Sequence, residues 1–396
     1  MGMIYLDSNA TSQVHPEVVE AMLPYLTDQW YNPSSGYRSA RAVRQAMDSA
    51  REQVAALINA HPEEIVFTGC GTESNNMALK WLARLVGRRE SRVVTSVIEH
   101  SAVLRPCEAM QAVGYEVAQC AVKPDGRLDL DEFCGLVDAE RPGFVSVMWS
   151  NNETGVINPV DEACAVAREA GWAFHTDAIQ AVGKMPVDVR KVPVDYLSLS
   201  GHKFHAPKGV GALYVREGVR FEPMIRGGGQ EDGRRSGTEN VPFIIGLGKA
   251  AEIMKAELDR DGHAGVRRRR DRLEERLTGE IEGVTLNGSR EHRAGNIVHA
   301  SFENCEAAGL LILLDEAGVQ CSAGSACMTG KQQPSHVQKA MGLSDEQARS
   351  SLRISLSIFT TDEEVEEAAT AVARAVQKLR SVQGPPGMGP VVVYGG

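Results

Sequence analysis

The chain has 396 residues, of which 43% are apolar and 24% charged, a composition typical of a folded globular protein and not of a disordered one. Its 52 acidic and 42 basic residues give a net charge of -10, which argues against nucleic acid or an anionic membrane as the main partner. The longest aliphatic run, Leu310–Leu314, is far shorter than the roughly 20 residues of a membrane span, and residues 1–9 lack a secretion signal, so we expect a cytoplasmic protein.

Short apolar runs separated by helical patterns fill the chain up to about residue 260, as a mainly parallel sheet with crossover helices requires. One of the helices shows its period clearly, because apolar residues recur three or four apart from Val43 to Leu57. We therefore expect an α/β fold whose large domain, residues 15–260, carries a mainly parallel seven-stranded sheet. The predicted strands are Ile65–Thr68, Val93–Ser96, Tyr115–Ala118, Val145–Met148, Ala173–Thr176, Tyr196–Leu199 and Gly211–Val215.

Two polar motifs follow predicted strands. The segment 69–74, Gly-Cys-Gly-Thr-Glu-Ser, opens a helix and presents backbone N–H groups and the Thr72 hydroxyl at a positive helix end. This pattern is consistent with an anion site and equally with a plain helix start. The segment 151–155, Asn-Asn-Glu-Thr-Gly, places amides where they can reach a cofactor ring oxygen or a substrate carboxylate.

Lys203 is the most informative residue. An apolar strand over Val194–Leu199 delivers it, together with Ser200 and His202, to a strand end, where open α/β sheets bind ligands. Most lysines simply point into water, but here Asp177 ends an earlier apolar strand over residues 172–176. The combination predicts pyridoxal phosphate, with a lysine bonded to the cofactor, an aspartate on its ring nitrogen, and hydroxyl and imidazole groups on its phosphate.

The pattern changes after residue 260, where we expect a smaller α+β domain formed by residues 1–14 and 261–382. Thr361 is expected to cap its closing helix, since Glu364 can reach back from three residues on. Residues 383–396 are rich in Gly and Pro, which predicts a flexible or partner-packed tail. The other elements expected in this domain are strands over Asn296–Phe302 and Leu352–Leu356 and a helix over Ala307–Ala317.

The basic cluster Arg267–Arg270 with Arg272 is interpreted as the solvated face of a helix. The eight cysteines are spread too widely for a disulfide framework. We expect Cys107, Cys134 and Cys164, which fall in helical patterns, to be buried as small hydrophobic residues. Cys327 differs, because it lies in a run of small polar residues typical of an exposed loop, where a thiol is available for chemistry.

The chain resembles the cysteine desulfurases, which are pyridoxal phosphate enzymes of the aminotransferase class V fold. The resemblance is closest to the nitrogen-fixation and iron-sulfur-assembly group. The resemblance runs over nearly the whole chain and implies the fold type I, aspartate aminotransferase-like architecture. It rests on Tyr5-Leu-Asp-Ser-Asn-Ala-Thr, Asn32-Pro-Ser-Ser, Gly71-Thr-Glu-Ser-Asn-Asn, Glu99-His-Ser-Ala-Val, Trp149-Ser-Asn-Asn-Glu-Thr-Gly, Phe174-His-Thr-Asp-Ala-Ile-Gln-Ala-Val-Gly-Lys, Ser200-Gly-His-Lys-Phe-His-Ala-Pro-Lys-Gly, Gly227-Gly-Gly-Gln-Glu-Asp-Gly-Arg-Arg-Ser-Gly-Thr-Glu-Asn, Ser322-Ala-Gly-Ser-Ala-Cys and Arg353-Ile-Ser-Leu-Ser.

The resemblance implies Lys203, Cys327 and His100 as catalytic residues, with His100 stacked on the cofactor ring. It assigns substrate binding to Asn152 and to Arg353, whose planar fork suits a carboxylate. The cofactor-binding residues that it implies are Gly71 and Thr72, His100, Asn152 and Gln180 at the ring, Asp177 at the ring nitrogen, Ser200 and His202 at the phosphate, Lys203, and Thr238, which would reach the phosphate of the neighbouring subunit of a homodimer.

The implied reaction removes sulfur from L-cysteine, leaving L-alanine and a persulfide on Cys327, which an iron-sulfur scaffold or another acceptor protein would then receive. The protein alone is expected to form no metal site, although Cys327 is a candidate ligand of a cluster. Cys321, six residues earlier, is interpreted as an inert small residue, with a sulfur relay as the alternative.

Other functions remain open at this stage. A selenocysteine lyase or another β-lyase of the same fold would keep Lys203 and Asp177. A zinc hydrolase would use His175, His202 and His205, which lack a convincing further ligand nearby. A non-enzymatic assembly scaffold is a third alternative. The sequence departs from the family pattern at Gly36-Tyr37-Arg38, at Ile358, and at Ser8, where relatives more often have Asn. It does not identify the sulfur acceptor or distinguish nitrogenase from general cluster assembly.

Overall fold

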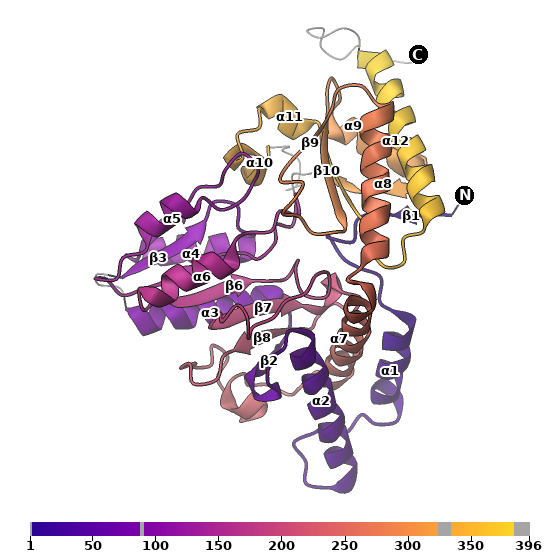
Figure 1. Cartoon of the computed structure of the whole chain (residues 1–396). Coiled ribbons are helices and arrows are strands. Elements are labelled where there is room, and N and C mark those ends of the chain that lie inside the picture. The colour runs from indigo at the N-terminus through magenta and orange to yellow at the C-terminus, as the bar shows by residue number, and fades with distance from the viewer. Residues whose placement is uncertain (1, 88–90, 324–333, 384–396) are drawn as a thin grey trace, which may run out of the picture.

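The computed structural model describes residues 2–87, 91–323 and 334–383. Its largest sheet has seven strands, and each of the seven predicted runs lies in one of them, with ends shifted by two residues at most (Figure 1). The strands are β2 (Ile65–Thr68), β3 (Arg92–Ser96), β4 (Glu116–Cys120), β5 (Gly143–Ser146), β6 (Ala173–Asp177), β7 (Tyr196–Ser200) and β8 (Gly211–Val215).

The strand order is β2-β8-β7-β6-β5-β3-β4. Of these strands, β8 runs in the direction opposite to the other six. Every residue of β2, β5, β7 and β8 is buried, because helices cover both faces of the sheet. The carboxyl ends of the parallel strands therefore meet at one edge, to which β6 brings Asp177 and β7 brings Ser200. The connecting helices are α3 (Gly71–Val86), α4 (Ser101–Ala112), α5 (Leu130–Leu136) and α6 (Val160–Glu169), with short 3-10 turns η1 (Pro62–Glu64), η2 (Gly201–Lys203) and η3 (Gln230–Gly233).

Three long helices pack beside the sheet: α1 (Pro16–Thr27), α2 (Arg38–Leu57) and α7 (Val241–Asp261). The predicted apolar stripe of α2 faces the main core, where Val43 and Val54 are completely buried. Its contact with α7 is close at Gly248, where an added Cβ would lie 2.5 Å from the Cα of Ala50. Only glycine allows the two helices to approach this far.

The smaller part of the chain has its own four-stranded antiparallel sheet and its own core, which includes Leu6 from the N-terminal segment. The predicted cap of the closing helix is confirmed, because the Glu364 N–H donates to Thr361 Oγ1 and the Thr361 N–H donates to the Glu364 carboxylate. The N-terminal strand β1 (Ile4–Tyr5) pairs in parallel with β11 (Val319–Gln320). The other elements are β9 (Val284–Leu286), β10 (Ile297–Phe302), β12 (Ser322–Ala323), β13 (Ser351–Ser355), α8 (Ala264–Glu280), α9 (Ala307–Glu316), α10 (His336–Ala340), α11 (Asp345–Arg349) and α12 (Asp362–Gln383).

Two expectations about individual side chains are wrong. Arg270, placed on a solvated face, is buried, because its guanidinium turns inward to donate to the Ala294 carbonyl and to Asp271. Cys134, expected to be buried, is exposed, because the short helix α5 buries only Phe133.

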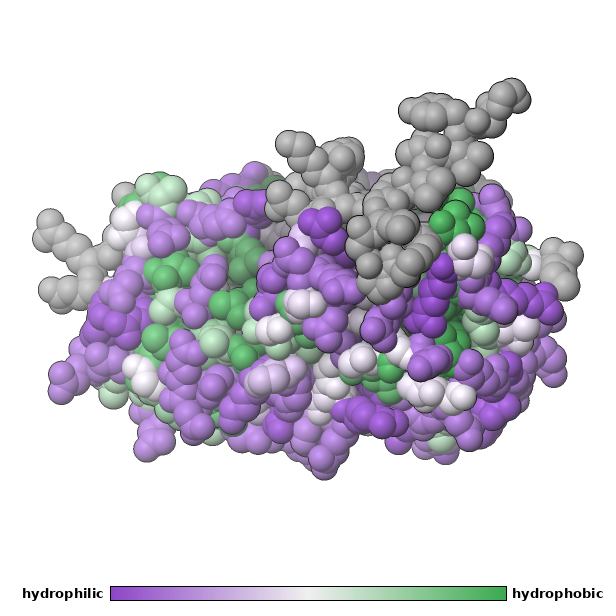
Figure 2. All heavy atoms as spheres, turned by 90° about the horizontal axis from the view of Figure 1, so that it is seen from above, coloured by the Kyte–Doolittle hydropathy of each residue, from purple (hydrophilic) through white to green (hydrophobic). Residues whose placement is uncertain are grey.

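No helix in the described part of the chain is long and apolar enough to cross a membrane. The face seen from above in Figure 2 is mostly hydrophilic, with hydrophobic patches between the polar side chains.

Candidate active site

A cavity of about 360 Å³ lies at the carboxyl ends of β6 and β7, beside the first turn of α3. Ten of the twelve predicted site residues line it, from segments as far apart as residues 71 and 353. They are Gly71, Thr72, His100, Asn152, Asp177, Gln180, Ser200, His202, Lys203 and Arg353.

Lys203 lies in η2, directly after β7, with its amine turned into the cavity wall. Its Nζ donates to the backbone carbonyls of Asn9 at 2.6 Å and Ala10 at 2.9 Å. Burial, with Arg353 nearby, lowers the pKa of this amine from 10.5 to about 8, although the carboxylates of Asp7 and Asp177 act in the opposite direction. A neutral, nucleophilic amine is therefore accessible close to physiological pH.

Asp177 ends β6 and is buried. Its two carboxylate oxygens accept hydrogen bonds from Asn75 Nδ2 at 2.7 Å and from the Ile179 N–H at 3.0 Å. Burial raises its pKa, while the Ile179 N–H and then the neighbouring His100 favour the charged form. The arrangement suits a carboxylate that faces a cationic ring nitrogen across the cavity.

His100 is the N-cap of α4, where its Nδ1 accepts a hydrogen bond from the Ala102 N–H at 3.1 Å. This bond fixes the ring orientation, and burial lowers the pKa of the imidazole. The preceding residue, Glu99, is fully buried, and its carboxylate accepts from Ser96 and from the Met148 N–H. Burial raises the pKa of Glu99 to about 8.

Gly71, Thr72, Ser200 and His202 form a polar cup at the N-terminus of α3, where the helix end and its N–H groups favour negative charge. An added Cβ at position 71 would lie 2.2 Å from Ile179 Cδ1 and 3.1 Å from Ser200 Cβ, so a larger residue there would displace the Ile179 side chain. Burial, followed by the charge of Lys203, lowers the pKa of His202 to about 4, so the ring is neutral near pH 7 and can donate one hydrogen bond.

Arg353 lies on β13 and reaches the cavity from the smaller sheet. Its Nη2 pairs with Asp7 at 2.7 Å and its Nη1 donates to the Asn152 carbonyl at 3.1 Å. Its Nε is buried without a hydrogen-bond partner among the described residues. This donor is free for an anionic group of a ligand.

Sequence reasoning did not single out Asn75, Lys184 or Asn9, although all three stand inside the motifs that carry the family resemblance. Asn9 joins several groups: its carbonyl accepts from Gln180 and Lys203, and its side-chain oxygen accepts from Lys184. Gln180, expected at a ring oxygen, lines the cavity, but its amide is also bonded to Asn9 and Lys184. Lys184 closes the motif that begins at Phe174, and its Nζ donates to the side-chain oxygens of Asn9 and Gln180.

Two predicted residues are not in this set. Thr238 is exposed in the loop before α7 and does not line the cavity of its own chain. Cys327 lies outside the described residues. The neighbouring Ser322 donates to Asp7 at 2.7 Å and thus lies beside the Asp7–Arg353 pair.

The proposed zinc ligands do not come together. His175 is buried in β6, and its two ring nitrogens are hydrogen-bonded to Ser146 and Ser198. His202 and His205 bond to Thr11 and to the Gln13 carbonyl. Over residues 2–87, 91–323 and 334–383, no three His, Cys, Asp or Glu side chains form a group able to hold a metal.

This cavity, with a lysine and an aspartate at adjacent strand ends, defines the class of protein, and the comparisons agree: the aminotransferase class-V model matches residues 4–367. A cysteine desulfurase of Trichormus azollae is 45% identical over 96% of this chain and 95% of its own. Cysteine desulfurase NifS of Azotobacter vinelandii is 44% identical over 96% and 94%. A solved structure described as a NifS-like protein is 36% identical over 95% of this chain and 100% of its own, with a TM-score of 0.88.

The chain therefore belongs to the aminotransferase class-V family. Within that family it is a member of the cysteine desulfurases of the NifS and IscS kind.

Proposed function

We propose that the chain uses pyridoxal 5'-phosphate to remove sulfur from L-cysteine, releasing L-alanine and leaving a persulfide on Cys327. The observation that carries this proposal is the cavity that Lys203 and Asp177 share, with a partly buried amine of lowered pKa just after β7 and a buried carboxylate at the end of the adjacent β6. Relatives named cysteine desulfurase, similar over nearly the whole chain, support the substrate.

The residues present fit the cofactor. Asp177 offers a carboxylate to the ring nitrogen, His100 offers a flat imidazole to the ring, and the cup at Gly71 is shaped and charged for a phosphate. The cofactor supplies, when bound, an acceptor for the electrons released at the substrate Cα. Lys203 would bond to it covalently.

The protein groups then bind substrate and move protons. Arg353, with one nitrogen free of partners, binds the substrate carboxylate and so fixes the Cα. The Lys203 amine, once exchanged for the substrate amine, takes the Cα proton, a role that its lowered pKa suits. Asp177, in the same cavity, is buried from bulk water.

Cys327 is the proposed nucleophile toward sulfur. Its thiolate attacks the sulfur of the substrate, so that an S–S bond forms while the substrate Cβ–S bond breaks. The electron pair of the broken bond stays with the Cβ, which is protonated to give the methyl group of alanine. Arg353 provides positive charge that favours the thiolate over the thiol.

The active protein is proposed to be a homodimer in which Thr238 reaches the phosphate site of the other subunit. The exposure of Thr238 away from its own cavity supports this arrangement. So does an exposed apolar strip that runs along one face of α1 and into the next loop, where Trp30 is 70% exposed. The strip consists of Val19, Leu23, Leu26 and Trp30.

The persulfide is proposed to pass to an iron-sulfur scaffold or another acceptor protein in the cytoplasm.

We also propose residues 15–260 as the large domain and residues 1–14 with 261–382 as the small one, supported by the separate cores.

The test of function is alanine release from L-cysteine and from L-selenocysteine by the holoenzyme. Release from selenocysteine alone would favour the lyase, and labelled cysteine would identify the protein that receives the sulfur.

A further inference from the structure

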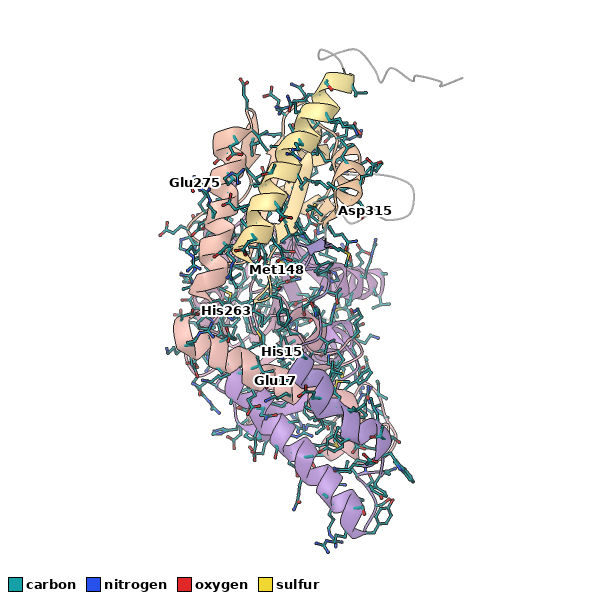
Figure 3. The ribbon with its side chains drawn as sticks, turned by 90° about the vertical axis from the view of Figure 1, so that its right-hand side faces the viewer. His15, Glu17, Met148, His263, Glu275 and Asp315 are labelled. Carbon is teal, nitrogen blue, oxygen red and sulfur yellow. The ribbon has the colours of Figure 1, made fainter. Side chains whose placement is uncertain are left out.

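Lys203 also borders a second cavity, of about 380 Å³, and it is the one residue that the described linings of the two cavities share. One wall comes from the sheet side, at Lys184 and His205. The other comes from the smaller part of the chain, at His263 and the segment 290–296. Figure 3 shows His263 at the junction of α7 and α8, between the two parts of the chain.

Four residues that line this cavity carry buried polar atoms without a hydrogen-bond partner among the described residues. Each of the four residues is at least nine-tenths buried. Unpaired buried polar atoms are costly, and such a concentration at one cavity indicates a polar ligand that bonds to several of them at once. The atoms are Ser8 Oγ, His263 Nε2, Arg293 Nε and Asn296 Oδ1.

The charge of the lining indicates the sign of that ligand. Arg293 pairs with Glu274 and Arg270 pairs with Asp271, so these two cations are balanced. Arg267 and Arg290, which are exposed, form no ion pair with the described residues, and Glu291 is the one acidic side chain in the lining. The unpaired Ser8 and Arg293 atoms are hydrogen-bond donors, which suit oxygen acceptors.

We propose that this second cavity binds a small oxyanion, a phosphate or a carboxylate, held by Ser8 and Arg293 with Arg267 contributing charge. The site goes beyond the proposed desulfurase chemistry, with whose cavity it shares Lys203. Its ligand would bridge the two parts of the chain and lie beside Asn296, whose Nδ2 shares the Asn9 side-chain oxygen with Lys184.

Calorimetric titration of the holoenzyme with inorganic phosphate, and separately with acetate, tests the proposal. We expect saturable binding of at least one anion, weakened about tenfold by Ser8→Ala, which removes a charge-assisted hydrogen bond. Ser8→Ala breaks no bond made by its side chain to the described residues, so loss of folding does not complicate the comparison. Binding of phosphate alone would identify the ligand as a phosphate, and binding of acetate alone would identify it as a carboxylate.

Arg267→Gln and Arg268→Gln form a matched pair, since Arg267 lines the cavity and the adjacent, exposed Arg268 does not. Only the first should weaken binding. A crystal of the holoenzyme soaked in selenate should show the anion beside Ser8 and Arg293. The proposal is overturned by absent saturable binding, by equal affinity in Ser8→Ala, or by anion density at Arg353 or Thr72 with only water in the second cavity. Normal alanine release in any of these cases would leave the desulfurase function standing.

Discussion

Asn75 donates a 2.7 Å hydrogen bond to Asp177, although 102 residues separate them along the chain. The first two turns of α3 bring Asn75 to the end of β6, where the Ile179 N–H supplies a second donor. Two donors to a buried carboxylate favour its charged form over the protonated form that burial alone would produce. The pair therefore opposes the protonation that burial favours, at the place where the cofactor ring nitrogen needs an anion.

Asp177→Asn should lower kcat/KM for L-cysteine by at least about a hundredfold, because the neutral amide no longer holds the ring nitrogen protonated. Asn75→Ala leaves the carboxylate in place and should lower kcat/KM about tenfold. Alanine release measures both. Equal rates for Asp177→Asn and the unchanged protein would contradict the role of the carboxylate.

Gly71→Ala should weaken cofactor binding between about fivefold and a hundredfold, since overpacking by one methyl group typically costs about 1–3 kcal/mol. The new Cβ meets Ile179 Cδ1 at 2.2 Å. The double variant Gly71→Ala/Ile179→Val, which removes that methyl group, should recover part of the affinity. Cofactor dissociation followed by absorbance decides the matter, and unchanged affinity in the single variant would show that the cup is not the phosphate site.

The pKa of Lys203 predicts how the cofactor-free protein takes up pyridoxal phosphate. Only the neutral amine reacts with the aldehyde, so the rate should rise between pH 7 and 9, with a midpoint near the pKa of about 8. With an unperturbed lysine, the rate would rise toward a midpoint at about pH 10.4. Arg353→Gln removes a neighbouring positive charge and should move the midpoint upward. Absorbance stopped-flow across this pH range measures it, and a midpoint near 10 would refute the lowered pKa.

Cys327→Ala should abolish alanine formation from cysteine, because the sulfur has no acceptor, while leaving the cofactor absorbance intact. Cys321→Ala provides the control. Burial raises the pKa of the Cys321 thiol to about 12, so it is protonated near neutral pH and should not replace Cys327 as nucleophile. Full turnover by Cys327→Ala would refute the assignment.

Much of this fold could be predicted from the sequence, because a buried parallel strand is a nearly unbroken apolar run. The runs at Tyr196–Leu199 and Gly211–Val215 each coincide with a strand. The sequence also predicted that Lys203 and Asp177 lie close together, because both follow or end parallel strands and the carboxyl ends of such strands share one edge.

The remaining features depend on contacts that no local pattern contains. The inward turn of Arg270 depends on the carbonyl of Ala294, which comes from a distant loop. Asn9 accepts hydrogen bonds from Gln180, Lys184 and Lys203 only because the N-terminal segment crosses between the two sheets. Lys184 is buried beside it for the same reason, and its pKa falls well below the usual value through burial and the nearby charge of Lys203.

Reduction of the holoenzyme with borohydride, followed by digestion and mass spectrometry, tests the central claim most directly. The account predicts a reduced pyridoxyl group on Lys203 and on no other residue. Lys184, the buried lysine that shares Asn9 with Lys203, is the internal control. A pyridoxyl group on Lys184, or on no lysine at all, would contradict the account.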